Sequence, residues 1–169
     1  MSQIIEYIKN KKILILGYGR EGISTYNYIR KHLPEKKLTI ADKNFLKLDD
    51  SNVDLICGDN YLSDLGDFDW VFKSPGIVLE QDKDFYRCKI LSEMDIFFER
   101  YKNQIIGITG TKGKSTTTTL MYHVLKTAGK KALLAGNIGI PVFDIAKDID
   151  EDTILVVELS CHQLEYATI

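Results

Sequence analysis

The sequence is poor in cysteine and proline, and it has no long hydrophobic run. Its 169 residues include only three cysteines and three prolines. Cys57, Cys88 and Cys161 are far apart and form no CxxC pair, which argues against a disulfide framework or a zinc site. They fit a reducing compartment, so we expect a cytoplasmic protein. The histidines are equally scattered, and we expect surface or packing roles for them.

Membrane segments and a charge imbalance are also missing. No apolar run approaches the roughly 20 residues that a membrane-spanning helix needs. Near the start, Ile4, Ile5 and Ile8 alternate with polar residues, which predicts a short amphipathic helix rather than a signal peptide. The net charge of −2 gives no electrostatic reason to expect nucleic acid or a membrane as partner. We expect a monomer.

Short apolar runs alternate with helical patterns, which predicts an α/β fold with a mainly parallel sheet. Strands are expected at residues 13–16, 38–40, 53–57, 70–73, 105–109, 132–135 and 154–158. Helices are expected at about 21–32, from the N-cap Ser92 to about residue 101, at 114–128, and from the end of the last strand to residue 169.

The chain has no Ser- or Pro-rich linker and no internal repeat. We place a domain boundary at Lys102–Asn103, which gives a Rossmann-like unit over residues 1–102 and a second unit over 103–169. The second unit is small for a parallel sheet that needs helices on both faces. We therefore expect the chain to be the front part of a longer protein, with the second domain incomplete.

A glycine loop between a predicted strand and a predicted helix indicates phosphate binding. It reads Gly110-Thr111-Lys112-Gly113-Lys114-Ser115-Thr116. The strict P-loop pattern has glycine where Ile108 stands, so this is a variant. The loop can still direct backbone N–H groups and a helix N-terminus at phosphates. Lys114 is placed to reach the β- and γ-phosphates of ATP, and Ser115 to ligate Mg²⁺.

A second glycine loop follows the first predicted strand. Gly17, Gly19 and Gly22 form a GxGxxG pattern, and Asp42 ends the next strand about 20 residues later, where a ribose-binding acid is expected. This geometry suits NAD or any ligand with a ribose and a pyrophosphate. The alternative is that these glycines only allow a strand and a helix to pack closely.

With both loops in this order, the chain resembles the front of a Mur ligase. In that family the first domain holds the UDP part of a UDP-N-acetylmuramoyl substrate, and the central ATPase domain carries a GTxGK[ST]T loop. Four further segments are similar to the family, namely Asp42-Lys43-Asn44 after the second strand, Ser74-Pro75-Gly76-Ile77, Gly136-Asn137-Ile138-Gly139 and residues 158–165. The last, Glu158-Leu159-Ser160-Cys161-His162-Gln163-Leu164-Glu165, resembles ELSSFQLE of the member that adds D-glutamate, with Cys161-His162 in place of Ser-Phe.

The resemblance implies roles for individual residues. Glu158 would ligate Mg²⁺ together with Ser115 and would act in catalysis with Lys114. Phosphates of ATP would lie on residues 110–116. Contacts with the UDP substrate are expected from Gly17, Gly19, Gly22, Asp42, Lys43, Ser74, Pro75, Gly76, Asn137, Ser160 and Gln163.

The implied reaction is ATP-dependent amide formation in peptidoglycan synthesis. The carboxylate of UDP-N-acetylmuramoyl-L-alanine takes the γ-phosphoryl group, and the amine of D-glutamate then displaces phosphate. A further metal ligand and the amino-acid-binding domain would lie outside this chain, so we expect no amide formation from these residues alone. Other interpretations stay open: a different Mur ligase, a non-catalytic nucleotide-binding module, or an NAD-linked dehydrogenase.

Overall fold

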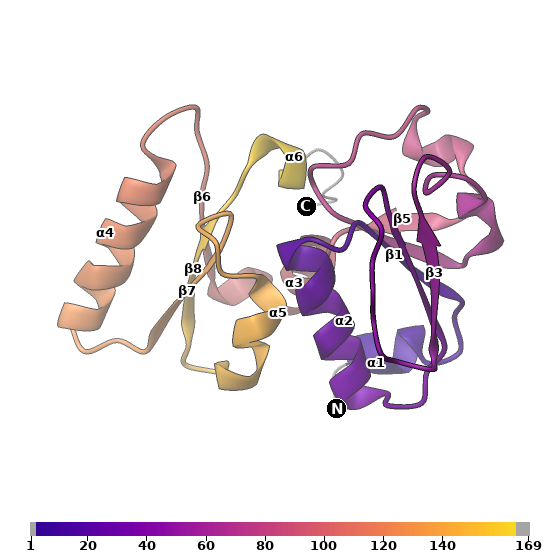
Figure 1. Ribbon diagram of the computed structural model, residues 1–169. Helices are drawn as coiled ribbons and strands as arrows, with labels where there is room; N and C mark the ends of the chain where they lie inside the picture. Colours follow the sequence, from indigo (N-terminus) through magenta and orange to yellow (C-terminus); the bar gives the residue numbers. More distant parts are fainter. Residues whose placement is uncertain (1–2, 165–169) are drawn as a thin grey trace. The chain divides into compact units, whose positions relative to one another are not determined.

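The computed structural model describes residues 3–164 and divides the chain into two compact units, residues 1–92 and 93–169 (Figure 1). Both units combine a parallel sheet with helices, which confirms the predicted α/β class. Among the helices of residues 3–164, none combines the length and apolar character that a membrane span requires.

The first unit holds a five-stranded parallel sheet in the order β3-β2-β1-β4-β5. Its strands are β1 (Ile13–Leu16), β2 (Leu38–Asp42), β3 (Val53–Cys57), β4 (Trp70–Lys73) and β5 (Lys89–Leu91). All four residues of the central strand β1 are buried, as expected for a strand covered on both faces. The sheet order brings the ends of β1, β2 and β4 together at one edge.

Helices α1 (Gln3–Ile8) and α2 (Arg20–His32) complete the first unit, together with the 3₁₀ turns η1 (Leu65–Asp67) and η2 (Lys83–Phe85). The predicted amphipathic helix is α1, in which Ile5 and Ile8 are fully buried; Met1 and Ser2 lie outside the described residues. Helix α2 begins at Arg20, within the GxGxxG pattern of Gly17, Gly19 and Gly22, and packs on β1 and β4.

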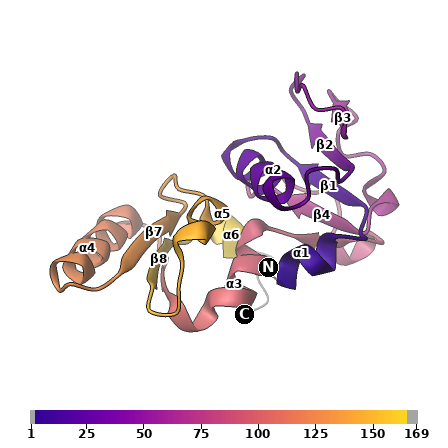
Figure 2. The same cartoon turned by 90° about the horizontal axis from the view of Figure 1, so that it is seen from below.

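The second unit has a three-stranded parallel sheet in the order β6-β8-β7. Its strands are β6 (Ile105–Ile108), β7 (Ala132–Gly136) and β8 (Ile154–Glu158). Its helices are α3 (Glu93–Tyr101), α4 (Lys114–Thr127), α5 (Val142–Ile145) and α6 (Cys161–Leu164), with 3₁₀ turns η3 (Lys102–Gln104) and η4 (Ala146–Asp148). Figures 1 and 2 show α4 on one face of this sheet and α5 on the other.

The compact units divide between Ser92 and Glu93, not at the expected boundary Lys102–Asn103. Helix α3 belongs with the second unit because it packs on α5. The buried Glu93 reinforces this packing, since its Oε1 accepts a hydrogen bond of 3.2 Å from the N–H of Val142, the first residue of α5. The helix expected to reach residue 169 is described only as α6, and residues 165–169 lie outside the described residues.

Candidate functional site

The loop between β6 and α4 is shaped by two glycines. Gly110 (φ +148°) and Gly113 (φ +77°) both adopt a backbone conformation that favours glycine. Gly113 is the N-cap of α4, and the half-buried Lys114 opens the helix. The Nζ of Lys114 donates a hydrogen bond of 2.9 Å to the carbonyl oxygen of Gly110. The lysine thus lies along the loop, at a helix N-terminus that favours anions.

The first turn of α4 presents hydroxyl groups to solvent. Ser115 and Thr116 are exposed, while Thr118 is fully buried and donates a hydrogen bond of 2.7 Å from Oγ1 to the carbonyl oxygen of Lys114. Thr118 therefore anchors the start of the helix. The two exposed hydroxyls, which the sequence assigns to Mg²⁺ and phosphate, remain accessible to a ligand.

Glu158 ends β8, the central strand of this sheet, which pairs with β6. Its side chain is 1% exposed. Oε1 accepts a hydrogen bond of 2.9 Å from Nδ2 of Asn137. Oε2 is buried and has no hydrogen-bond partner among the described residues. Burying a carboxylate oxygen without a hydrogen-bond partner costs free energy.

A tight turn after β7 positions Asn137. Gly136 (φ +97°) accepts a hydrogen bond of 3.1 Å from the N–H of Gly139, and a Cβ at Gly136 would lie 2.2 Å from the carbonyl oxygen of Glu158. The N–H of Asn137 donates to that same carbonyl at 2.9 Å. Asn137 therefore contacts Glu158 through both its backbone and its side chain, and only glycine allows the turn to approach so closely.

Ser160 and Gln163 bind each other at the start of α6. The N–H of Ser160 donates to Oε1 of Gln163 at 3.0 Å, and the N–H of Gln163 donates to Oγ of Ser160 at 3.2 Å. Gln163 is buried, whereas Cys161 and His162 are exposed. The expected substrate contacts of Ser160 and Gln163 stay predictions, and Glu165 of this segment lies outside the described residues.

The donor set at this edge fits a magnesium ion that keeps most of its other ligands from water and phosphate. Within residues 3–164, no group of three His, Cys, Asp or Glu side chains is placed to hold a metal. Mg²⁺ needs no such cage, because it is usually bound by one or two carboxylates plus phosphates and water. The buried Oε2 of Glu158 and the exposed hydroxyl of Ser115 are the groups that could supply its protein ligands.

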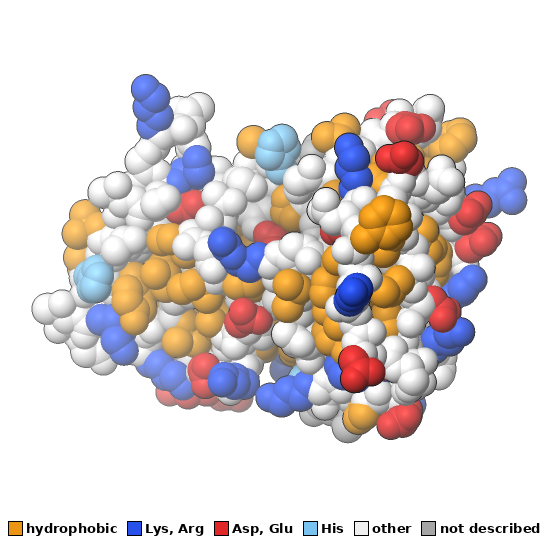
Figure 3. All heavy atoms as spheres, viewed as in Figure 1, with side chains coloured by type: hydrophobic (Ala, Val, Ile, Leu, Met, Phe, Trp, Pro, Cys, Tyr) orange, Lys and Arg blue, Asp and Glu red, His pale blue; other side chains and the backbone are white. Residues whose placement is uncertain are grey.

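A shallow groove of about 530 Å³ extends from the glycine loop of residues 110–116 to the turn after β7. It is lined by Ser115, Thr116, Thr119, Leu120, His123 and Ile138. The structure thus brings two segments that the sequence assigned to ATP and to substrate onto one surface. Figure 3 shows hydrophobic side chains gathered over α4 and the strands beside it, and Leu120 is 62% exposed.

The glycine loop of the first unit uses its three glycines differently. A Cβ at Gly22 would lie 1.9 Å from the carbonyl oxygen of Gly17, so this glycine lets α2 approach the loop. Gly17 (φ +90°) is covered by Ile77 and Ser74. A Cβ at Gly19 would meet no atom of the described residues within 4 Å. Close packing therefore accounts for Gly17 and Gly22 but not for Gly19.

Asp42 closes the same loop. Its Oδ2 accepts a hydrogen bond of 2.7 Å from the N–H of Tyr18, and its Oδ1 accepts one of 2.8 Å from the N–H of Asn44. A carboxylate offers about four lone-pair sites, so Asp42 can also accept a hydroxyl from a ligand. Lys43 is exposed beside it. The predicted ribose contact is compatible with this geometry and stays a prediction.

The turn after β4 lies directly against the glycine loop. Ser74 Oγ donates to the carbonyl oxygen of Gly17 at 3.1 Å, and the N–H of Ser74 donates to the carbonyl oxygen of Leu16 at 2.9 Å. Pro75 is half-buried and Gly76 is exposed. The structure thus brings together the three first-unit segments that the sequence singled out. It also adds a residue that the sequence reasoning missed, the buried Lys73.

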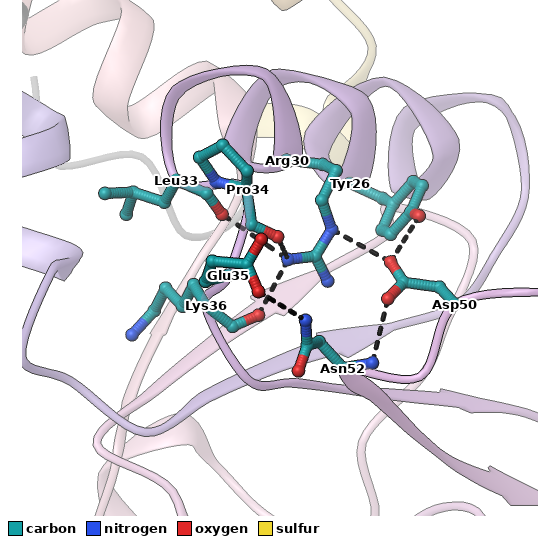
Figure 4. A network of polar contacts seen from close by, with 8 residues as sticks. All are labelled: Tyr26, Arg30, Leu33, Pro34, Glu35, Lys36, Asp50 and Asn52. Carbon is teal, nitrogen blue, oxygen red and sulfur yellow. Dashed lines mark hydrogen bonds and ion pairs between the residues drawn. The ribbon is translucent and has the colours of Figure 1, made fainter.

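Tyr18 in the glycine loop contacts a polar network on α2. Its ring meets that of Tyr26 edge-on, with ring centroids 5.9 Å apart, and burial is the main cause that raises the pKa of the Tyr18 phenol. The hydroxyl of Tyr26 donates to Asp50 at 2.7 Å, and Asp50 pairs with Arg30 Nε at 2.9 Å (Figure 4). Arg30 Nη1 also donates to the carbonyls of Leu33, Pro34 and Lys36. The network fastens the end of α2 to the segment before β3.

The second unit has a counterpart among known families. Residues 108–169, from the end of β6 to the end of the chain, match the Mur ligase middle domain. The likeness to individual proteins is wider and includes the first unit. The chain is therefore similar to Mur ligases in both of its units.

Two of the curated relatives that it matches carry the same name. The chain is 38% identical to UDP-N-acetylmuramoylalanine--D-glutamate ligase of Clostridium kluyveri, over 94% of this chain and 37% of the relative. It is 35% identical to the ligase of the same name from Clostridium botulinum strain Hall, over 96% of this chain and 38% of the relative. The chain therefore spans a little over a third of the length of these relatives.

Proposed function

We propose that this chain belongs to an ATP-dependent ligase that joins D-glutamate to UDP-N-acetylmuramoyl-L-alanine. The observation that carries the proposal is the similarity to ligases of that name, because it extends over 94% of the chain and so covers both units. In this proposal the second unit binds ATP with Mg²⁺, and the first unit binds the UDP part of the substrate.

The residues of the second unit would act mainly by position and charge, as is general in phosphoryl transfer. Lys114 rotates from the Gly110 carbonyl to the β- and γ-phosphates, and the N–H groups at the start of α4 bind phosphate oxygens. Glu158 and Ser115 would hold a magnesium ion, and the chemistry that this ion would supply is positive charge near the γ-phosphoryl group. Asn137 keeps the carboxylate of Glu158 oriented.

In the first unit, the open backbone at Gly19 is where a pyrophosphate would approach the start of α2. Asp42 would accept a hydrogen bond from the ribose while keeping its bond to the N–H of Tyr18. Lys43 and the turn at Ser74, Pro75 and Gly76 flank the same sheet edge, at the ends of β2 and β4. Their assignment to the UDP substrate remains part of this proposal.

Binding is a sharper test than turnover, because the chain spans little more than a third of its relatives. Calorimetry should detect one site for ATP with Mg²⁺ and a separate site for UDP-N-acetylmuramoyl-L-alanine. Binding of ATP but not of the UDP-sugar would leave a nucleotide-binding module. Binding of NADH that UDP cannot displace would support a dehydrogenase instead.

The metal role of Glu158 can be separated from a structural role. Glu158→Gln keeps the acceptor for Asn137 but removes the charge. If the carboxylate serves Mg²⁺, we expect the affinity for ATP with Mg²⁺ to fall about tenfold or more, ATP without Mg²⁺ to bind as before, and the unfolding midpoint not to fall. Glu151→Gln, at an exposed position of the same unit, is the control. A loss of stability without a loss of magnesium-dependent affinity would contradict the metal role.

A further inference from the structure

Lys73 is a buried lysine that the proposed function does not yet use. It ends β4, and its side chain is 5% exposed. Its Nζ donates hydrogen bonds to the carbonyl oxygens of Ile77 at 2.7 Å and Ser74 at 3.3 Å. We infer that Lys73 is a positioning residue, which holds the turn of residues 74–77 in the shape that the UDP site of the first unit requires. The inference rests on the proposed function of that unit.

The ammonium group fixes both ends of one turn. The N–H of Ile77 donates to the carbonyl oxygen of Ser74 at 3.1 Å, which closes the turn. Lys73 then binds the carbonyls of the first and last residues of that turn from the side of the strand. Charged donors make stronger hydrogen bonds than neutral ones. A change in this one side chain would therefore alter the turn as a unit.

This turn also shapes the glycine loop. Ser74 Oγ donates to the carbonyl oxygen of Gly17 at 3.1 Å, and a Cβ at Gly17 would lie 2.8 Å from Cδ1 of Ile77. Both ends of the turn thus lie close to Gly17. Since the loop of Gly17 and Gly19 connects β1 to α2, displacement of the turn would move the backbone where the pyrophosphate is proposed to bind.

The choice of lysine at this position supports a role in the site. Trp70, Val71 and Phe72 precede it in β4, so an apolar residue would continue the strand. Burying an ammonium group costs free energy unless its donors are satisfied, and lysine is rarely fully buried. The carbonyls of the turn supply acceptors, so the charge serves to organise the turn rather than to fill the core. Binding sites keep their geometry only where such supporting contacts lock it.

The test compares Lys73→Met with Lys89→Met. Methionine keeps an unbranched apolar stem and removes the ammonium group. Lys89 lies on the neighbouring strand β5, where its Nζ is 4.7 Å from the centre of the Trp70 ring, and it is exposed. We expect Lys73→Met to weaken UDP binding about tenfold or more, with ATP binding to the second unit within about twofold of the unchanged protein. Lys89→Met should leave both affinities unchanged. Equal UDP affinity in Lys73→Met and the unchanged protein would overturn the inference.

Amide NMR spectra without any ligand test the positioning independently of UDP. Lys73→Met should shift the N–H signals of Gly17, Ser74 and Ile77, whereas Lys89→Met should not. Unshifted signals would overturn the inference even if the proposed function holds, and shifted signals with no UDP binding by the unchanged protein would overturn the proposed function alone. If Lys73→Met does not fold, Lys73→Ala with added propylamine replaces it. Recovery of the three signals and of UDP affinity supports the inference, and failure of the folded Lys73→Ala protein to respond opposes it.

Discussion

Asn137 Nδ2 donates a hydrogen bond of 2.9 Å to Oε1 of Glu158, and the N–H of the same asparagine donates to the Glu158 carbonyl oxygen at 2.9 Å. The asparagine thus satisfies one oxygen of a carboxylate that is 1% exposed and leaves the other, Oε2, available. A ligand of positive charge at the end of β8 would complete the arrangement.

Replacing Asn137 by alanine should destabilise the second unit. Oε1 of Glu158 would lose its partner while staying buried, and an unsatisfied buried acceptor costs about 1–3 kcal/mol. Urea unfolding followed by circular dichroism measures the change. Asn103→Ala, at an exposed position in η3, is the matched control and should change the free energy of unfolding by less than about 0.5 kcal/mol. Equal effects of the two substitutions would show that the Asn137 side chain does not support Glu158.

Two alanine substitutions in the glycine loop of the first unit should differ in their effect on stability. Gly22→Ala would place a methyl group 1.9 Å from the Gly17 carbonyl oxygen, so α2 must move away from the loop. We expect a loss of about 2 kcal/mol or more in the free energy of unfolding. Gly19→Ala meets no described atom within 4 Å and should be near neutral for stability.

Gly19→Ala also separates ligand binding from packing at this loop. If a pyrophosphate approaches the backbone there, the added methyl group should weaken UDP binding about tenfold in a protein of unchanged stability. Calorimetry with UDP measures this. Unchanged UDP affinity in Gly19→Ala would favour the alternative in which the glycines serve only the close packing of β1 and α2.

Local sequence was enough to predict most strands and the position of the glycine loop of residues 110–116 between a strand and a helix. Apolar runs predicted β1, β3, β4 and β8 with the bounds that the structure has, because each of these strands is a short and mainly apolar run. Strand β5 and helix α5 were missed, since three or four residues are too few to show a period. The compact units divide earlier in the chain than the predicted domain boundary, because α3 packs on α5, which is far from it in sequence.

Predicting the contacts within the site would have required the strand order as well as the motifs. The sequence marked Asn137 and Glu158 separately, but their hydrogen bond depends on β7 and β8 being neighbours in register, with Gly136 opposite Glu158. It also marked Ser74 without Lys73, whose contacts form only once the turn folds back on the strand end. A charged residue at the end of an otherwise apolar strand was the available signal.

Lys114→Met tests the phosphate loop. The lysine makes its hydrogen bond to the Gly110 carbonyl while half-exposed, so its loss should cost little stability. Hydrogen bonds to a charged group contribute about 1.5–3 kcal/mol, which predicts a loss of ATP affinity of roughly 10- to 100-fold. Lys126→Met, in the last turn of the same helix, changes net charge equally and should keep the affinity. Equal losses in both variants would show a general charge effect.

The network around Asp50 should make the stability of the first unit depend on pH. The hydrogen bond from Tyr26 is the main cause that holds the pKa of the Asp50 carboxyl below its ordinary value of 3.8, with further lowering from the N–H of Asn52 and from Arg30. A lowered pKa in the folded state stabilises the fold above the unfolded pKa, and this contribution is lost as pH falls through the folded value. The free energy of unfolding of the first unit should therefore decrease below about pH 4.

Tyr26→Phe should reduce that acid dependence, because it removes the donor that most lowers the pKa of Asp50. The pKa of the Tyr26 phenol is itself raised, chiefly by burial and then by Asp50. The hydroxyl group therefore remains a donor at neutral pH. Urea titrations between about pH 3 and 6 would compare this variant with Tyr7→Phe, where the ring is 63% exposed. The slope of stability against pH should fall for Tyr26→Phe and stay unchanged for Tyr7→Phe. Parallel slopes in all three proteins would mean that Asp50 does not couple folding of the first unit to pH.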